Sequence, residues 1–250
     1  MKIGVSTLAL FPMSLKEILD YLECIKVEYC EILQEYPYNL IDHELVNSYN
    51  LKTTVHAPIS DINIASPNES IRKASVEEIK NSMDLATKID ASVIVVHPGK
   101  MEFLAREFEE KIIFNRLNSL KECSKYADEL GIKMCIENMP DMDGMLCKDL
   151  NELNTLTKEI NVYMVLDVGH AHNMGISIED MLKYDNIGHI HLSDNDGSFD
   201  NHDAIGSKNI DFKSLFKGLK SIDFEGINVI EVKAQDEILR SIEYINSLDI

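Results

Sequence analysis

The chain has 250 residues and carries 43 acidic against 24 basic side chains, which gives a formal net charge of −19. This excess repels nucleic-acid phosphates and anionic membranes at long range, so neither is an expected partner, although a local basic groove for nucleic acid is not excluded. The five cysteines are scattered without a C-x-x-C pair, the first residues resemble a strand instead of a signal peptide, and no apolar run approaches ~20 residues. We therefore expect a cytoplasmic protein with reduced thiols and no membrane-spanning segment.

The first half of the chain alternates short apolar runs with longer amphipathic segments. Strands are expected at residues 3–6, 29–33, 51–55 and 92–96, and the β-branched run 93–96 is typical of a strand buried on both faces. Ser14 and Glu17 form a capping box for the first helix, and Ser66 followed by Pro67 predicts the start of a helix that reaches residue 88. A shorter helical stretch is expected at residues 40–49.

The second half of the chain continues the same alternation. Strands are expected at residues 133–136, 162–166, 188–192 and 227–230, and helices at residues 103–130, 148–159, 211–222 and 236–248. Gly131 is placed to end the first of these helices, and the segment 177–180 caps a further one. Eight strand-helix units in a chain without a flexible linker predict a single (β/α)8 barrel over residues 1–250. A doubly wound open sheet is the alternative, but no Gly-rich phosphate turn follows the first strand.

Six consecutive strands end in a histidine or a carboxylate. In a (β/α)8 barrel these ends meet on one face, where the chemistry takes place. Imidazoles and carboxylates that converge on one point need a positive partner, and mixed nitrogen and oxygen ligands fit zinc, manganese or iron better than calcium. The six residues, in strand order from the third to the eighth, are His56, His97, Glu137, Asp167, His191 and Glu231.

Three loop residues are expected to join this metal site. His170 follows Asp167 by three positions, so both side chains can face the strand ends from one turn. Asp200 and His202 are two apart, and in an extended segment their side chains would project to the same side and chelate together.

Other polar residues near the strands have a structural or solvated interpretation. His172 and His189 are expected either to contact the metal-binding residues without binding the metal or to be structural, and Cys135 to be a small core residue. The remaining three, His43, Glu31 and Glu35, are expected to be solvated, although the two glutamates flank the second strand and have the reach to enter the site.

Seven short motifs lie at or just after the ends of the third to the eighth strand. They are V-H-A-P at residues 55–58, V-H-P-G at 96–99, I-E-N at 136–138, L-D-V-G-H at 166–170, H-L-S-D at 191–194, D-N-H at 200–202 and I-E at 230–231. Singly each motif is weak, but together they resemble those of the xylose isomerase-like TIM barrels, which include sugar-phosphate isomerases, epimerases and endonuclease IV.

The resemblance implies two different chemistries. In the isomerase and epimerase branch one metal ion is held by the residues that match Glu137, Asp167, His191 and Glu231, and the two glutamates move a proton to and from carbon. In the endonuclease branch three zinc ions are held. The matching sets are His56, His97 and Glu137 for the first ion, the four residues just named for the second, and His170, Asp200 and His202 for the third.

We expect the isomerase or epimerase chemistry, on a small sugar or sugar phosphate, with Glu137 and Glu231 as the catalytic pair. The cofactor would be a divalent metal, zinc first and up to three ions, with manganese or cobalt as alternatives at the four-ligand site. The runner-up is a three-zinc phosphodiesterase or AP endonuclease, which the full ligand set favours and the net charge opposes. A ligand-binding barrel without catalysis is a third alternative. Lys208, where the family has glycine, and Lys100 are candidates for binding a substrate phosphate, with Lys233 a weaker one.

Overall fold

Residues 1–249 of the chain are described by a computed structural model, in which eight parallel strands close into a barrel in strict sequence order. Each strand pairs with the next, and β8 pairs with β1. The strands are β1 Lys2–Ser6, β2 Tyr29–Leu33, β3 Lys52–His56, β4 Val93–Val96, β5 Lys133–Glu137, β6 Tyr163–Asp167, β7 Ile187–Leu192 and β8 Ile227–Ile230. The expected (β/α)8 architecture is therefore confirmed.

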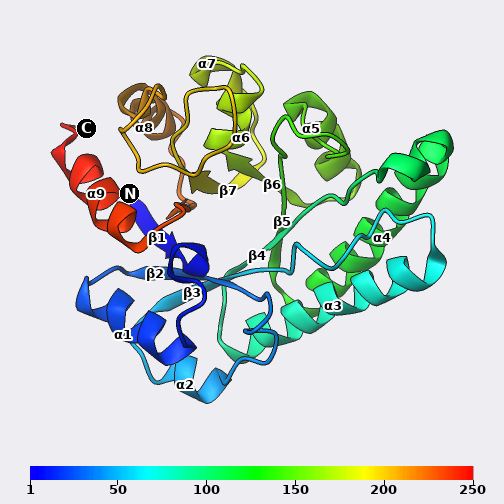
Figure 1. Cartoon of the computed structure of the whole chain (residues 1–250), viewed down its shortest axis with the longest axis horizontal. Coiled ribbons are helices and arrows are strands. Elements are labelled where there is room, and N and C mark those ends of the chain that lie inside the picture. The colour runs from blue at the N-terminus through cyan, green and yellow to red at the C-terminus, as the bar shows by residue number, and fades with distance from the viewer. Residues whose placement is uncertain (250) are drawn as a thin grey trace.

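Helices surround this barrel and connect its strands (Figure 1). The two longest, α3 and α4, pack against each other and against the side of the barrel near β3 to β5. The helices are α1 Leu15–Cys24, α2 His43–Asn47, α3 Glu69–Lys88, α4 Glu109–Leu130, α5 Leu150–Glu159, α6 Val168–Asn173, α7 Ile178–Met181, α8 Phe212–Ser221 and α9 Gln235–Ser247, with 3-10 turns η1 Thr7–Leu10 and η2 Phe103–Phe108. Within residues 1–249, none of these helices combines the length and the apolar character that crossing a membrane requires.

Local sequence signals placed most helix ends correctly. The Ser14–Glu17 capping box is formed, and Gly131 ends α4 with a left-handed backbone (φ 70°). The predicted start of α3 at Ser66 and Pro67 is wrong, because Asn68 is the N-cap and its side chain accepts a hydrogen bond from Ser70 N. The hydroxyl of Ser66 instead accepts from Asn68 N in the turn before the helix. The structure also adds η1 and α6, which were not expected.

Alternation along the strands divides the barrel into an outer and an inner set of side chains. Ile94, Ile136 and Leu166 belong to the large core between strands and helices, whereas Val95, Cys135 and Val165 pack together as a separate cluster. Successive side chains on a strand point to opposite faces, so the inner set continues two residues further along each strand. On β5 and β6 those next inner positions are Glu137 and Asp167, at the rim of the barrel.

Candidate functional site

Glu137 is the residue around which the site is assembled. Its Oε2 atom lies 3.2 Å from His56 Nε2 and 3.1 Å from His97 Nε2. Its Oε1 atom lies 3.1 Å from His191 Nδ1 and 3.5 Å from His170 Nδ1. One buried carboxylate at the end of β5 thus joins histidines from β3, β7 and α6 and the histidine that follows β4.

His191 is the meeting point of the carboxylates. Its Nδ1 atom lies 3.1 Å from Glu137 Oε1, 3.2 Å from Glu231 Oε2 and 3.8 Å from Asp167 Oδ2. The side chains of all four residues are at most 9% exposed. We call Glu137, Asp167, His191 and Glu231 the strand-end cluster, since each lies at the end of a strand or directly after it.

His170, Asp200 and His202 form a second group, the loop cluster. Asp200 Oδ2 lies 3.2 Å from His170 Nε2 and 2.9 Å from His202 Nε2. The expected pairing of Asp200 with His202 is present, but not through an extended segment, because His202 has a left-handed backbone (φ 49°). The turn directs its ring toward Asp200, and its Nδ1 atom makes a 2.8 Å hydrogen bond to the carbonyl oxygen of Glu231.

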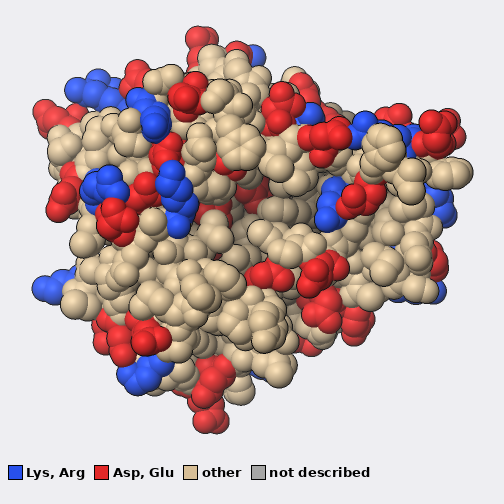
Figure 2. Space-filling view, viewed as in Figure 1, with Lys and Arg blue, Asp and Glu red and all other residues tan. Residues whose placement is uncertain are grey.

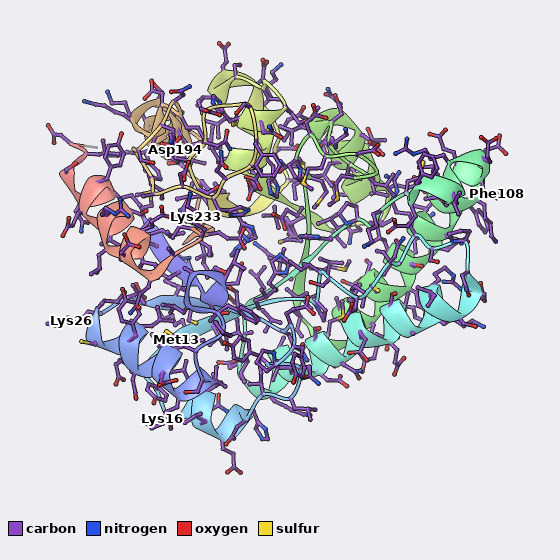
Figure 3. All side chains as sticks on the ribbon, viewed as in Figure 1. Met13, Lys16, Lys26, Phe108, Asp194 and Lys233 are labelled. Atoms are coloured by element: carbon purple, nitrogen blue, oxygen red, sulfur yellow. The ribbon has the colours of Figure 1, made fainter. Side chains whose placement is uncertain are left out.

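Asp194 holds the loop that carries Asp200 and His202. Its backbone exchanges two 2.9 Å hydrogen bonds with Asp203, and its carboxylate accepts from the backbone N–H groups of Lys208 and Ile210. Figure 3 shows Asp194 in the segment that leads from β7 to α8, near Lys233 and far from Phe108 at the outer tip of the long helices. The loop therefore folds back on its own beginning.

Both clusters fit a divalent cation by their donor sets. The ligand atoms of the strand-end cluster lie within 4.8 Å of one another, as do those of the loop cluster and those of His56, His97 and Glu137. Asp167 Oδ2 and Asp200 Oδ1 are buried without a hydrogen-bond partner, which is costly unless a cation satisfies them. All nine predicted residues come together in this way, while their role as metal ligands stays a prediction.

The histidines balance the charge of these carboxylates. Burial lowers the pKa of His170, but Asp167 and Asp200 outweigh this effect and raise it to about 9. Burial likewise opposes the ionised form of His202, yet Asp200 and Glu231 raise its pKa to about 10. Burial raises the pKa of Asp167 to about 6. A metal ion that binds here would displace protons from the imidazoles, so its binding would be favoured by alkaline pH.

The predicted phosphate-binding lysines lie beside the site and are paired with acids. Lys100 and His97 line one cavity, and Lys100 Nζ lies 3.3 Å from a Glu102 carboxylate oxygen. Lys208 Nζ lies 3.6 Å from Asp203 Oδ2, and Lys233 also forms an ion pair with Asp203. Lys208 and Lys233 therefore share one carboxylate, and Glu237 is a further acid near Lys233.

Glu31 is not the solvated carboxylate that was expected. It lies in the middle of β2, is fully buried, and makes a 2.8 Å hydrogen bond to His189 Nε2. Its Oε1 atom lies 2.9 Å from His191 Nε2. The signal that could have revealed it is a glutamate flanked by apolar residues inside a barrel strand, two positions below the rim.

The expectation for Glu35 is wrong, and those for His43 and Cys135 are confirmed. Glu35 is half-buried and accepts hydrogen bonds from the backbone N–H groups of Ile59 and Ser60, so the prediction of a freely solvated side chain is wrong. His43 is exposed and Cys135 is buried, as predicted.

Comparison with known proteins gives the family. A model of the xylose isomerase-like TIM barrel matches residues 37–248. An uncharacterized protein of Methanocaldococcus jannaschii is 35% identical over 98% of this chain and 88% of its own length. A crystal structure of a D-tagatose 3-epimerase-like protein superimposes with a TM-score of 0.91 at 32% identity, covering 99% of this chain and 97% of that one.

More distant relatives include one named as an epimerase and one named as an endonuclease. The fructoselysine 3-epimerase of Escherichia coli O157:H7 is 22% identical over 75% of this chain and 70% of its own length. A protein of Malacoplasma penetrans named probable endonuclease 4 is 27% identical over 65% of this chain and 61% of its own length. From the barrel, the strand-end residues and these matches, the chain belongs to the xylose isomerase-like TIM barrel family.

Proposed function

We propose that this protein is a divalent-metal-dependent isomerase or epimerase that acts on a small sugar or sugar phosphate. The observation that carries the proposal is the strand-end cluster, in which Glu137 and Glu231 both approach His191 Nδ1 from different strands of the barrel. The names of similar proteins, which include 3-epimerases of sugars and sugar derivatives, support the same reaction class.

Glu137, Asp167, His191 and Glu231 would hold the metal ion. When bound, such an ion polarises a carbonyl and a neighbouring hydroxyl group of the substrate and so makes the adjacent C–H bond more acidic. Burial of the four side chains keeps bulk water away from them, which strengthens each electrostatic interaction in the site.

The two glutamates would carry out the proton transfers. One carboxylate removes the proton from the carbon next to the carbonyl group, which leaves an enediolate, and the other, in its protonated form, returns a proton. Return to the opposite face of the same carbon gives the epimer. Return to the neighbouring carbon, together with transfer of the hydroxyl proton from one enediolate oxygen to the other, gives the aldose or ketose isomer. Either outcome exchanges a carbon-bound hydrogen with the protein and, through it, with the solvent.

The test follows from this exchange. The purified protein, loaded in turn with zinc, manganese or cobalt, is incubated in deuterated water with a panel of ketoses and their phosphates, and deuterium on carbon is measured by mass spectrometry and NMR. We expect incorporation at a single carbon next to the carbonyl group. Cleavage of an abasic-site duplex at physiological salt, with no exchange into any sugar, would overturn the proposal.

A three-zinc phosphodiesterase is the second candidate, and the loop cluster is the observation that favours it. With His56, His97 and Glu137 it completes three neighbouring groups of possible ligands. The electrostatics oppose a nucleic-acid substrate, because the chain has a formal net charge of −19 and acidic side chains line the hollow at the centre of the face seen in Figure 2, although basic side chains also lie beside it. A phosphate backbone approaching this face would be repelled unless the metal ions outweighed the acids.

Lys208 and Lys100 would favour a phosphorylated sugar over a neutral one. Both lie beside the site, and a substrate phosphate would compete with Asp203 for Lys208 and with Glu102 for Lys100. A lysine that pairs with an acid before substrate arrives gives up one ion pair to form another, so each contribution to substrate affinity would be modest.

A further inference from the structure

The inner wall below the strand-end cluster is polar on one side only. One layer further into the barrel the inner side chains include Val95, Cys135 and Val165, which pack against one another. On the side of β2, β3 and β7 the same layer holds Glu31, Thr54 and His189 instead, all of them at most 1% exposed. A buried carboxylate in this layer costs free energy unless hydrogen bonds or charged partners compensate for its burial.

The histidines of the site are oriented in two different ways. His56, His170 and His202 each place Nδ1 at 2.7–2.8 Å from a backbone carbonyl oxygen and turn Nε2 toward a carboxylate of the site. A carbonyl oxygen only accepts, so Nδ1 carries a proton in each of these rings, and when the ring is neutral the lone pair is on Nε2 and faces the site. These tautomers are determined by the backbone.

His191 has the opposite orientation. Its Nδ1 atom faces the carboxylates of the strand-end cluster, and its Nε2 atom points to Glu31 Oε1 at 2.9 Å, though not in hydrogen-bond alignment. The backbone of β7 is already engaged in the sheet, with β6 on one side and with β8 on the other. A proton on His191 Nε2 would therefore find its acceptor in Glu31 and not in the backbone.

The other oxygen of Glu31 is already engaged. Glu31 Oε2 accepts a 2.8 Å hydrogen bond from Thr54 Oγ1 and another of 2.8 Å from His189 Nε2. These two donors determine how the carboxylate is rotated and leave Oε1 directed at His191. We propose that Glu31 is a positioning residue, which holds the His191 proton on Nε2 and so presents the lone pair of Nδ1 to the metal ion of the strand-end cluster. This inference rests on the proposed metal site.

The substitution Glu31→Gln tests the proposal because it reverses the hydrogen-bond polarity at nearly the same volume. The two donors on the Oε2 side require the amide oxygen there, so the amide NH₂ would face His191 Nε2. His191 would then have to accept at Nε2 and carry its proton on Nδ1, where it cannot bind a metal ion. Outer-shell partners of metal-bound histidines typically contribute about 10–100-fold to affinity.

The experiment measures zinc affinity and histidine tautomers in the full-length protein. Zinc binding is followed by competition with a chromophoric chelator, and the tautomer of His191 is read from long-range ¹H–¹⁵N spectra of histidine-labelled protein. We expect Glu31→Gln to weaken binding at the tightest site about 10–100-fold and to change the His191 nitrogen signals. Glu35→Gln is the matched control, since Glu35 follows the same strand and accepts hydrogen bonds from the backbone N–H groups of Ile59 and Ser60, and it should leave both readouts unchanged.

Two further variants, Thr54→Val and Glu137→Gln, separate failure of the positioning role from failure of the metal site. Thr54→Val removes one donor to Glu31 without touching a charge and should weaken zinc binding a few-fold, which provides the test if Glu31→Gln fails to fold. Unchanged affinity and unchanged His191 signals in Glu31→Gln, with zinc lost from Glu137→Gln, would overturn the positioning role alone. Unchanged zinc binding in Glu137→Gln would overturn the metal site, and this inference with it.

Discussion

The strand-end cluster and the loop cluster consist of the same kinds of side chain but are held in different ways. Glu137, Asp167 and His191 end or lie within strands whose backbones are paired on both sides. Asp200 and His202 lie in a segment without regular structure, and the side chain of His202 is 21% exposed. Barrel closure alone assembles the first group, whereas the second depends on the loop that Asp194 anchors.

This difference separates the two candidate functions. The strand-end cluster is sufficient for the proposed proton transfers, since it contains both glutamates and four side chains whose ligand atoms lie close enough together to hold one metal ion. The loop cluster adds a third group of ligands, which an isomerase does not need and a three-metal phosphodiesterase does. Variants that disable one cluster at a time therefore test which cluster the reaction requires, and with it the proposed function.

The largest effect is expected from Glu137→Gln, which affects both the strand-end cluster and the group with His56 and His97. The amide retains the shape of the carboxylate but cannot accept a proton or balance the charge of a metal ion. We expect kcat/KM for the sugar reaction to fall about 10³-fold, with an unchanged circular dichroism spectrum. Near-normal turnover would refute the assignment of Glu137.

Disabling the loop cluster should have a much smaller effect on the same reaction. His202→Asn removes one ligand of that cluster and leaves the strand-end residues in place. We expect one metal ion fewer per chain by mass spectrometry, and a decrease of less than about 10-fold in deuterium exchange, which is below the range of direct acid–base contributions. A loss of exchange as complete as that in Glu137→Gln would show that the two clusters act as one unit.

The pH dependence of stability should report the protonated histidines of the site in the chelator-treated protein. The raised pKa values of His170 and His202, about 9 and about 10, mean that their protonated forms stabilise the fold fully below the ordinary histidine pKa of 6.5. This stabilisation is lost as the pH rises from about 6.5 through 9 and 10. We expect the melting temperature to fall over that window.

Metal-loaded protein and the His202→Asn variant are the controls for this pH dependence. Protein saturated with zinc should show a smaller decline, because the imidazoles then bind the ion instead of protons. In His202→Asn the decline of the chelator-treated protein should be smaller as well. A melting temperature that stays level from pH 6.5 to 10 in the chelator-treated wild type would contradict the charge balance inferred for the loop cluster.

The smallest effect is expected at the lysines beside the site. Lys208→Ala removes a charge that is already shared with Asp203, so KM for a phosphorylated sugar should rise only about 3–10-fold, the scale of one partly exposed charged contact. KM for the unphosphorylated sugar should not change, and this difference distinguishes phosphate binding from a structural effect. Equal increases for both substrates would exclude phosphate recognition by Lys208.

Much of the fold and the outline of the site could be predicted because the signals are local. Each apolar run that ends in His56, Glu137 or Asp167 can be recognised from a few adjacent residues, and parallel strands that alternate with helices bring such ends to one face. Helix ends at Ser14 and Gly131 likewise depend on neighbouring residues only. For these reasons nine residues spread over 176 positions could be assigned to one site in advance.

Only the tertiary structure decided which residues support that site. Glu31 meets His191 across the interior of the barrel, between strands that are not neighbours in the sheet, and no pattern along the chain records how far two such strands are shifted. The direction of His202 depends on one left-handed residue in an irregular loop. The sequence by itself determined the strands, their order and the residues at their ends, because each of these depends on near neighbours. The contacts across the barrel and the path of the loop depended on closure of the whole sheet.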